Sequence, residues 1–362
     1  MTKETGRGLV LAGPLPDDLF ICPDCGASIE GATLVCPRCE RRYLNGRVAC
    51  FNDRGAYFRS VPPKPEMLAL LSLARTWGYR HALREYLAPR FQYLLSRTPL
   101  AVPARAHVLS LLDLSGGERV LDFGAALGVL AVPLARMVRE VVALEATHQA
   151  VDFLNVVRDQ EQLPNLVPVC NGDPLRLPFR GASFDRVIFN AAFEYLPETI
   201  DVPDVRQAHQ LALKEVHRVL RPGGRLCIGT KNRFSYQTFL GAKDHHDLYF
   251  TPLLPRRVAN SIAMRLRRRP YRTIVHSLWE YRRLLRGAGF TGIRFYWPRP
   301  DLWRPATFVP LSRGRWPVYA GARQTAGYSR FKASALAAAA LGGFLPALVP
   351  TYVILAERSE SA

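Results

Sequence analysis

The sequence predicts an α/β protein with a doubly wound, mainly parallel sheet and a small metal-stabilised module at its N-terminus. Two observations support this fold class. From about residue 105 onward, short apolar runs of strand length alternate with helical patterns, which is typical of a parallel sheet covered by helices. Near the N-terminus, four cysteines fall in two CxxC pairs, which indicates a segment folded around a metal ion.

Composition sets the size and the charge of the molecule. The 362 residues are enough for one large domain or two ordinary domains, and 48% of them are hydrophobic, which suffices for a core. The formal charge is +19, and six of the 49 basic residues are lysine. This excess of base favours contact with phosphate, anionic lipid or an acidic polymer. The segment Met1–Glu4 lacks the apolar core of a signal peptide, so we expect a cytoplasmic protein with reduced cysteines.

A glycine-bearing loop organises the central part of the chain. The apolar strand Val120–Phe123 contains Asp122 and leads into a turn with Gly124 and Gly128, and an apolar helix is expected to begin near Gly128. A second strand, Val141–Glu145, ends in a carboxylate at the distance where an acid that binds ribose belongs in a nucleoside-binding βαβ unit. The pattern predicts a crevice for a nucleoside, with the N-terminal amides of the helix pointing into it.

Three further segments follow in the order and spacing of a known family. They are Asn171–Asp173, Phe184–Asn190 and Glu215–Leu226. Together with the glycine loop and Glu145, they resemble the class I S-adenosylmethionine-dependent methyltransferases, of the type 11 kind, over roughly residues 105 to 230. The resemblance implies a seven-stranded, Rossmann-like methyltransferase sheet with S-adenosylmethionine as its cofactor.

The resemblance also assigns residues to the cofactor. These are Asp122, Gly124, Ala126, Gly128, Glu145, Asp173 and Asn190. Glu145 is expected to bind both ribose hydroxyls, and Asp173 is expected to meet the exocyclic amine of adenine. The alternative is that these acids are solvated residues at strand ends. The family has a third glycine where this chain has Ala126, and a positive φ at that alanine would be strained.

The two CxxC pairs predict a structural zinc site. Pairs of thiolates at this spacing fold around one tetrahedral Zn²⁺, and so short a segment cannot build a core without the metal. The expected ligands are Cys22, Cys25, Cys36 and Cys39. A redox CxxC would instead have one pair beside a βαβ unit. The segment resembles the small zinc-ribbon proteins that accompany or activate methyltransferases. It is also similar to the N-terminal zinc module of a bacterial ribosomal RNA guanine methyltransferase, whose ligand set differs.

Proline and composition mark the expected domain boundaries. The expected domains are a zinc ribbon at 1–60, a linker and helical cap at 61–104, and a methyltransferase domain at 105–358 with an insertion at about 298–345. The linker begins with the stiff segment Pro62–Pro65. Apolar residues at helical spacing predict helices from about Glu66 to Ser96, and a further helix is expected from Ala104 to Leu112.

The segment after the fourth strand, Asn190–Leu196, holds the position from which the family contacts its methyl acceptor. It lacks the Asn-Pro-Pro-Tyr signature of methyltransferases that modify the adenine amino group, and it resembles the segment of small-molecule methyltransferases. Methyl transfer needs a base only where the acceptor must lose a proton. The candidate base is His245 or His246, in the loop after the fifth strand, with a neighbouring carboxylate to orient it. The alternatives are histidines without a catalytic role, or metal ligands.

The most basic stretch, Arg256–Arg286, has ten arginines and a single acid, Glu280. On its first half, Val258, Ile262 and Leu266 recur at helical spacing and predict an apolar stripe with arginines on the other faces. Such a helix could lie on anionic lipid or hold a phosphate backbone. A solvated basic face is the alternative.

The C-terminal part is expected to complete the sheet. Ser277 and Glu280 predict a capping box that opens a helix, and Ile293–Trp297 predicts a sixth strand. Residues 333–356 carry no charge, but two prolines interrupt them, so no transmembrane helix is expected. Instead, we expect a helix, a turn and an antiparallel seventh strand at Thr351–Leu355.

These observations predict a methyltransferase that transfers the methyl group of S-adenosylmethionine to a small-molecule or saccharide-like acceptor, at oxygen. The expected cofactors are S-adenosylmethionine and structural Zn²⁺. The expected partners are a small molecule or glycan, with RNA or an anionic membrane surface as further partners. One alternative is methylation of ribosomal or transfer RNA, favoured by the zinc module and the basic surface. The other is a binding or scaffolding protein that kept the fold without catalysis, favoured by Ala126.

Overall fold

The computed structural model describes residues 16–312 and 344–360, except positions 17, 32, 54, 56–60, 93, 95–97, 102–104 and 201–204. The chain divides into two compact units. Unit 1 comprises residues 1–102 and 113–185, and unit 2 comprises residues 103–112 and 186–362. The cysteine-rich N-terminal segment therefore belongs to the same compact unit as the glycine loop.

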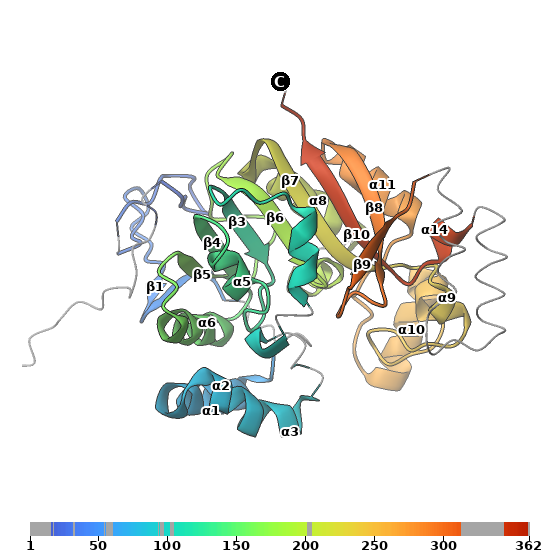
Figure 1. Cartoon of the computed structure of the whole chain (residues 1–362), viewed down its shortest axis with the longest axis horizontal. Coiled ribbons are helices and arrows are strands. Elements are labelled where there is room, and N and C mark those ends of the chain that lie inside the picture. Colours follow the sequence, from blue (N-terminus) through green and yellow to red (C-terminus); the bar gives the residue numbers. More distant parts are fainter. Residues whose placement is uncertain are drawn as a thin grey trace, which may run out of the picture. The chain divides into compact units, whose positions relative to one another are not determined.

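The described strands of unit 1 follow one another in the order β1-β2-β5-β4-β3. Their bounds are Leu44–Asn45 (β1), Val48–Asn52 (β2), Arg119–Phe123 (β3), Glu140–Glu145 (β4) and Leu166–Asn171 (β5). β3, β4 and β5 run parallel and consist almost wholly of buried residues, as expected for strands covered on both faces. β2 pairs in parallel with β5, and β1 pairs antiparallel with β2, so a hairpin of the N-terminal segment extends this sheet (Figure 1).

Helices of unit 1 pack on one another and on the strands. α1 (Lys64–Trp77) packs on α6 (His148–Glu161), which lies against β2, β4 and β5 (Figure 1). The other described helical segments are α2 (Tyr79–Ala82), the π-helical η1 (Leu83–Leu87), α3 (Ala88–Arg90), η3 (Pro99–Ala101) and α5 (Ala131–Ala135). α1 begins directly after Pro63, and a proline in its first turn removes no helix hydrogen bond. The expected linker thus passes straight into a helix.

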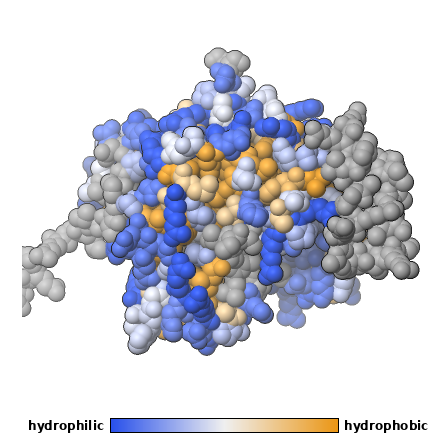
Figure 2. All heavy atoms as spheres, in the orientation of Figure 1, coloured by the Kyte–Doolittle hydropathy of each residue, from blue (hydrophilic) through white to orange (hydrophobic). Residues whose placement is uncertain are grey.

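The strands of unit 2 follow one another in the order β6-β7-β10-β8-β9. Their bounds are Phe184–Asn190 (β6), Leu220–Lys231 (β7), Phe290–Arg299 (β8), Thr307–Pro310 (β9) and Thr351–Arg358 (β10). β10 pairs antiparallel with both β7 and β8, which confirms the expected seventh strand. Figure 2 shows apolar residues gathered across the visible face where β7 and β10 lie in Figure 1.

Helices of unit 2 include one packed pair. α8 (Val205–Val219) and α11 (Leu278–Gly287) pack on each other, and they lie against β7 and β8 respectively (Figure 1). The expected capping box of Ser277 and Glu280 is present at the start of α11. The other described helical segments are η4 (Ala106–Leu111), η5 (Phe193–Tyr195), α7 (Leu196–Thr199), α9 (Tyr236–Phe239), η6 (Thr251–Leu253), α10 (Arg256–Arg267) and α14 (Leu345–Leu348).

The predicted fold class is confirmed, with differences in detail. The protein has a mixed α/β, Rossmann-like fold, and the described residues form ten strands where seven were expected, because β1 and β2 come from the N-terminal segment and β9 from the insertion. The expected helix at Ala104–Leu112 is a 3₁₀ helix over Ala106–Leu111. The helix expected after residue 333 lies outside the described residues. Among the helices that are described, none has the length and apolarity needed to cross a membrane.

Candidate functional site

The glycine loop after β3 folds back onto the end of β4. The backbone amides of Gly124 and Ala125 donate hydrogen bonds to the carbonyl oxygen of Leu144, at 2.9 and 3.2 Å. Gly124 and Gly128 have φ angles of +76° and +94°, which glycine adopts without strain. A Cβ atom at Gly128 would lie 3.1 Å from Cδ2 of Leu154, so the loop also packs closely against α6. The fold itself therefore requires a glycine at position 128.

The helix after this loop begins later than expected. α5 begins at Ala131 and has five residues, and residues 126–130 form turns instead. Gly128, at φ +94°, cannot belong to a right-handed helix. Pro133 is compatible with α5 because it lies in the first turn, where its missing N–H is not needed. The expected helix start near Gly128 is therefore three residues too early, and the direction of the helix amides toward the crevice stays a prediction.

Glu145 contacts the glycine loop directly. The amide of Ala126 donates a short hydrogen bond to Oε1 of Glu145, and the amide of Ala146 donates to Oε2 at 3.1 Å. Glu145 is buried at the end of β4, so the carboxylate lies at the loop of Asp122 to Gly128. Ala126 has a φ of +51°, the conformation that strains an alanine and suits a glycine. A carboxylate oxygen can accept more than one hydrogen bond, so these contacts do not prevent Glu145 from binding hydroxyl groups.

Two buried polar atoms beside these strand ends have no hydrogen-bond partner in the described chain. They are Oγ1 of Thr147, two residues after Glu145, and Oδ1 of Asn171, at the end of β5. Buried polar atoms are rarely left without a partner, so these two oxygens are available to the polar groups of a ligand. A hydroxyl, an amide oxygen and a carboxylate suit the hydroxyl and amine donors of a nucleoside. The residues present in unit 1 therefore fit a nucleoside cofactor.

Asp173 lies two residues after the end of β5 and lines a cavity of about 170 Å³. Its Oδ1 accepts a hydrogen bond from the amide of Leu175 at 3.0 Å, and its Oδ2 accepts one from Nε of Arg176 at 3.2 Å. Asp24 and Arg41, from the cysteine-rich segment, line the same cavity. The N-terminal segment thus forms one wall of the cavity at Asp173, which the sequence did not predict.

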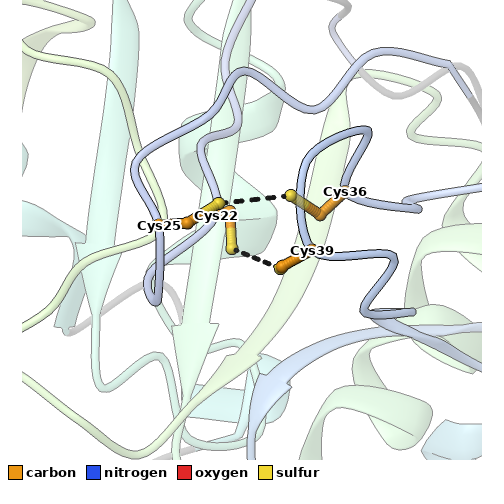
Figure 3. A group of neighbouring side chains, drawn as sticks. All are labelled: Cys22, Cys25, Cys36 and Cys39. Atoms are coloured by element: carbon orange, nitrogen blue, oxygen red, sulfur yellow. Dashed lines mark hydrogen bonds between the residues drawn. The ribbon is translucent and has the colours of Figure 1, made fainter.

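The four cysteines of the N-terminal segment lie together (Figure 3). Their Sγ atoms all lie within 4.8 Å of one another. The sulfurs of Cys22 and Cys39 are 3.6 Å apart, and those of Cys25 and Cys36 are 3.4 Å apart. Four sulfurs bound tetrahedrally at about 2.3 Å from one zinc ion would be about 3.8 Å from one another. The cluster therefore has nearly the dimensions of a four-cysteine zinc site, which leaves no coordination position open.

Both CxxC pairs fold as knuckles of the same shape. The amide of Gly26 donates to the carbonyl oxygen of Cys22 at 2.9 Å, and the amide of Glu40 donates to that of Cys36 at 3.0 Å. Burial disfavours the Cys22 thiolate, but hydrogen bonds from the Tyr43 hydroxyl and from backbone amides lower the pKa of Cys22 to about 6. At Cys22 the contacts thus favour the ionised form in which cysteine binds metal, whereas the pKa values of Cys25 and Cys39 are raised.

A chain of hydrogen bonds runs through the interior of unit 2. Nε2 of His245 lies 3.5 Å from Oε1 of Glu194, whose Oε2 accepts a hydrogen bond from the Thr230 hydroxyl at 3.1 Å. The Thr230 hydroxyl lies 2.9 Å from that of Tyr281. All four side chains are buried. Burial and the charge of Lys231 lower the pKa of His245 below its ordinary value, against the opposing effect of Glu194, so the imidazole is neutral at pH 7.

His245 lines a cavity of about 280 Å³ within unit 2. Lys231 and Trp303 belong to the same wall. His246 points elsewhere, because its Nε2 lies 3.1 Å from the hydroxyl of Thr273. The structure therefore separates the two adjacent histidines, and its geometry favours His245 as the candidate base.

Asn190 ends β6 and is half-buried in unit 2. Its Oδ1 has no hydrogen-bond partner in the described chain, and a Cβ atom on Gly229 would come within 2.9 Å of that oxygen. The carbonyl oxygen of Asn190 accepts a hydrogen bond from Nη2 of Arg105 at 3.4 Å. The buried guanidinium of Arg105 stacks over the ring of Trp303, 4.1 Å from its centroid. Asn190 is thus connected through Arg105 to the wall of the cavity.

Three residues of this part of unit 2 were not expected from the sequence. They are Glu194, Arg105 and Trp303. Glu194 stands between Phe193 and Tyr195, in a segment expected to line a site. An acid between two aromatic residues could have indicated its functional role. Arg105 and Trp303 are distant in the sequence, so tertiary structure alone brings them together.

The basic helix α10 buries a face other than its apolar stripe. Ala259 and Ala263 pack against the neighbouring loop, with Ile262 at the edge of the contact. Val258 and Leu266 of the predicted stripe are exposed, at 45% and 63%. The small alanines allow close approach to the rest of unit 2, which leaves the larger side chains of the stripe on the surface.

The parallel strands, the glycine loop and the carboxylate at the end of β4 define an α/β protein of the nucleoside-binding kind. Residues 121–228 match the family described as methyltransferase domain. The resemblance found from the ordered motifs is thereby confirmed.

Curated relatives of the chain are methyltransferases that match it over part of their length. The demethylmenaquinone methyltransferase of Staphylococcus epidermidis is 27% identical over 152 residues, which are 42% of this chain and 57% of the relative. Methyltransferase GfsG of Streptomyces halstedii is 34% identical over 120 residues, 32% of this chain and 39% of the relative. The chain therefore spans about half or less of the length of these two relatives.

Solved structures with a similar course of the chain include a cyclase and an N-methyltransferase. The [4+2]-cyclase SpnF has 18% identity and a TM-score of 0.43, over 72% of this chain and 82% of that chain. Phosphoethanolamine N-methyltransferase 2 of Haemonchus contortus, in complex with S-adenosyl-L-methionine, has 14% identity and a TM-score of 0.46, over 80% of this chain and 59% of that chain.

Proposed function

We propose that the protein transfers the methyl group of S-adenosylmethionine to a hydroxyl oxygen of a small-molecule or saccharide-like acceptor. One observation carries the proposal: within the family segment, the buried carboxylate of Glu145 lies against the glycine loop. An acid at the end of the second strand is the group that holds ribose in nucleoside-binding α/β proteins. Bound S-adenosylmethionine supplies an electrophilic methyl group on a sulfonium sulfur.

Unit 1 holds the cofactor in this proposal. Glu145 accepts hydrogen bonds from the two ribose hydroxyls, and Asp173 accepts one from the adenine amine. Thr147 and Asn171 supply the two buried oxygens that have no partner in the described chain. Gly124 keeps the loop backbone open to the methionine part, because it has no side chain.

Unit 2 supplies the base. Nε2 of His245 faces Glu194, so the ring proton lies on Nε2 and Nδ1 keeps the lone pair. A pKa held below its ordinary value leaves this imidazole neutral at pH 7, able to accept the hydroxyl proton as the acceptor oxygen is methylated. Glu194 is a positioning residue, because it acts through His245. A cavity of about 280 Å³ beside His245 is close to the lower size limit of small-molecule sites, which favours a small acceptor over a polymer.

The cysteine cluster binds a structural zinc ion in this proposal. Its support is the set of four sulfurs within 4.8 Å of one another and the shared knuckle geometry. Four thiolates complete the tetrahedral coordination, so the metal stabilises the fold and takes no part in methyl transfer.

Methyl transfer can be measured with S-adenosylmethionine labelled in its methyl group. The acceptors to be compared are hydroxyl-bearing phenols, saccharides, a demethylmenaquinone-type quinone and total RNA. We expect label in a hydroxyl-bearing small molecule, as a methyl ether. Label on carbon, or in RNA, would refute the proposed acceptor. A folded protein that binds no S-adenosylhomocysteine at high micromolar concentration would instead support the non-catalytic alternative.

The role of Glu145 predicts a selective loss of cofactor binding. Glu145→Gln removes the charge from two hydrogen bonds to ribose, each worth about 1.5 kcal/mol or more, so we expect affinity for S-adenosylhomocysteine to fall about 100-fold. Isothermal titration calorimetry measures this. The matched control is Glu140→Gln at the other end of β4, where the carboxylate pairs with Arg119 at 2.7 Å. Equal affinities for the Glu145 variant and the native protein would show that the ribose lies elsewhere.

A further inference from the structure

Exposed large apolar side chains are concentrated in one stretch of unit 2. Seven of the thirteen large hydrophobic residues exposed in the described chain come from residues 239–266, each with 45% to 63% of its surface accessible. They are Phe239, Leu240, Tyr249, Phe250, Val258, Met264 and Leu266, and we call them the α9–α10 patch. Monomeric soluble proteins rarely concentrate exposed apolar side chains in this way, so the patch indicates a binding surface.

The loop between α9 and α10 is fastened to both. Gly241, just after α9, lies against the ring of Phe250, because a Cβ atom on it would be 3.9 Å from Cζ of that ring. Leu248 packs in one cluster with Ala259 and Ala263 of α10. Arg267, at the end of α10, donates a hydrogen bond to the carbonyl oxygen of Asp247 at 2.9 Å. These contacts therefore fix the loop that carries Tyr249 and Phe250 to α10. Figure 1 shows α9 and α10, both in unit 2.

The same surface is strongly basic. Four exposed arginines of α10 and the residues just after it form no ion pair with a carboxylate of the described chain. They are Arg257, Arg265, Arg268 and Arg269. The sequence has no acid between residues 248 and 279, so no nearby carboxylate reduces this charge along the chain. The charge favours an anionic partner, and the exposed apolar side chains favour one that also offers an apolar phase.

An anionic bilayer meets both requirements. Arginine side chains pair with lipid phosphates, and leucine and phenylalanine side chains enter the boundary between headgroups and acyl chains. An RNA would use the arginines and could stack bases on Tyr249 and Phe250, but it leaves Val258, Met264 and Leu266 exposed. We therefore propose that the α9–α10 patch binds the surface of an anionic lipid membrane, with α10 lying in the plane of the interface. This binding is independent of the proposed methyl transfer.

Vesicle sedimentation with the full-length protein tests the proposal. The probes are vesicles of phosphatidylcholine alone and vesicles that also contain phosphatidylglycerol. Each is used at low and at high salt. We expect sedimentation with the anionic vesicles, weakened by salt. The triple variant Arg265→Gln, Arg268→Gln, Arg269→Gln removes three charges, each worth about a fivefold change, so binding falls by roughly 100-fold. Phe250→Ser with Leu266→Ser lowers binding about tenfold or more, because both lose apolar insertion.

Matched controls separate the patch from total charge and total apolar surface. The charge control is Arg42→Gln, Arg84→Gln, Arg286→Gln, and the apolar control is Leu68→Ser, Leu211→Ser; all five positions are exposed and lie outside the patch. Neither control changes binding by more than about twofold if the proposal holds. Circular dichroism confirms that each variant is folded. Equal loss in patch and control variants would overturn the proposal. A second result would also overturn the proposal: the arginine variant loses RNA binding while the Phe250/Leu266 variant binds vesicles as the native protein does. The surface would then bind a nucleic acid.

Discussion

Ala126 holds a left-handed backbone conformation while its amide donates to Glu145. Glycine adopts this conformation freely, and an alanine in it costs about 1 kcal/mol. We therefore expect Ala126→Gly to raise the free energy of unfolding by up to about 1 kcal/mol, measured by urea denaturation. Ala131→Gly, at the first residue of α5, is the control and should lower it, because glycine disfavours a helix. A loss of stability in Ala126→Gly would mean that the loop relaxes away from the described conformation.

The neutral state of His245 predicts the pH dependence of methyl transfer. A base must be unprotonated, so the rate rises with pH through the pKa of His245 and is constant above it. Because burial and Lys231 lower that pKa, the rise lies below the ordinary histidine value of about 6.5. Lys231→Met removes one cause of the lowering and should move the rise to higher pH. Lys243→Met, in the same cavity wall, is the control. A profile that does not move in Lys231→Met would exclude His245 as the titrating base.

Single residues were predictable where their chemistry repeats a pattern in the sequence. The spacing of the four cysteines predicts their cluster, and Glu145 ends a predicted strand next to the glycine loop. Both could therefore be placed before the fold was known. Glu194 could not, because its partner His245 comes from a loop 51 residues further along the chain. The sequence offered Asp244 and Asp247 as nearer carboxylates. Tertiary packing, and not proximity along the chain, decides which acid meets the histidine.

At the scale of the element, the cysteine-rich segment is the part most open to test. If the four cysteines bind zinc, the protein purified with Co²⁺ in place of zinc should hold one ion per chain and show thiolate charge-transfer absorption. Cys36→Ser should lose the ion and lower the unfolding temperature, because the segment depends on the metal. Cys50→Ser, on β2 outside the cluster, should keep both. A native protein that folds fully and binds no metal would contradict the assignment.

Cys36→Ser also tests whether the cysteine-rich segment contributes to the cavity at Asp173. Asp24 lies between Cys22 and Cys25, Arg41 follows Cys39 by two residues, and both line that cavity. Loss of the metal should therefore weaken S-adenosylhomocysteine binding as well, whereas Cys50→Ser leaves it unchanged. If affinity survives metal loss, the ribbon wall makes no contribution to the cofactor.

Elements with a strong pattern were predicted better than those shaped by packing. The parallel strands and the capping box of α11 follow from local sequence, and both are present. The start of α5 was misplaced, because the positive φ of Gly128 cannot be read from an apolar run. The face that α10 buries was not predictable either, since two alanines pack while larger apolar residues stay outside.

At the scale of the whole molecule, buried histidines make stability depend on pH. Burial lowers the pKa of His245, and burial with the neighbouring His276 lowers that of His209 well below its ordinary value. The unfolded chain binds protons at these residues near pH 6.5, and the folded chain does so at lower pH. Stability is therefore fully present above about pH 6.5 and falls as the pH decreases, by up to about 1.4 kcal/mol per pH unit for each histidine.

Urea unfolding at pH 7.5 and at pH 5 measures this loss. Replacing one buried histidine, as in His245→Gln, should make the difference between the two pH values smaller. His81→Gln, at an exposed position, should leave it as in the native protein. A stability that is the same at both pH values would show that the buried imidazoles are not neutral in the folded state.

The pairing of β2 with β5 has a consequence for how the family segment can be isolated. A protein shortened to begin after residue 60 would present the backbone amides and carbonyls of β5 as an open template, to which a strand of another molecule can add. The cysteine-rich segment thus shields its own neighbour from self-association. Preparations of the family segment alone should keep residues 18–52 with it, or expect insoluble protein.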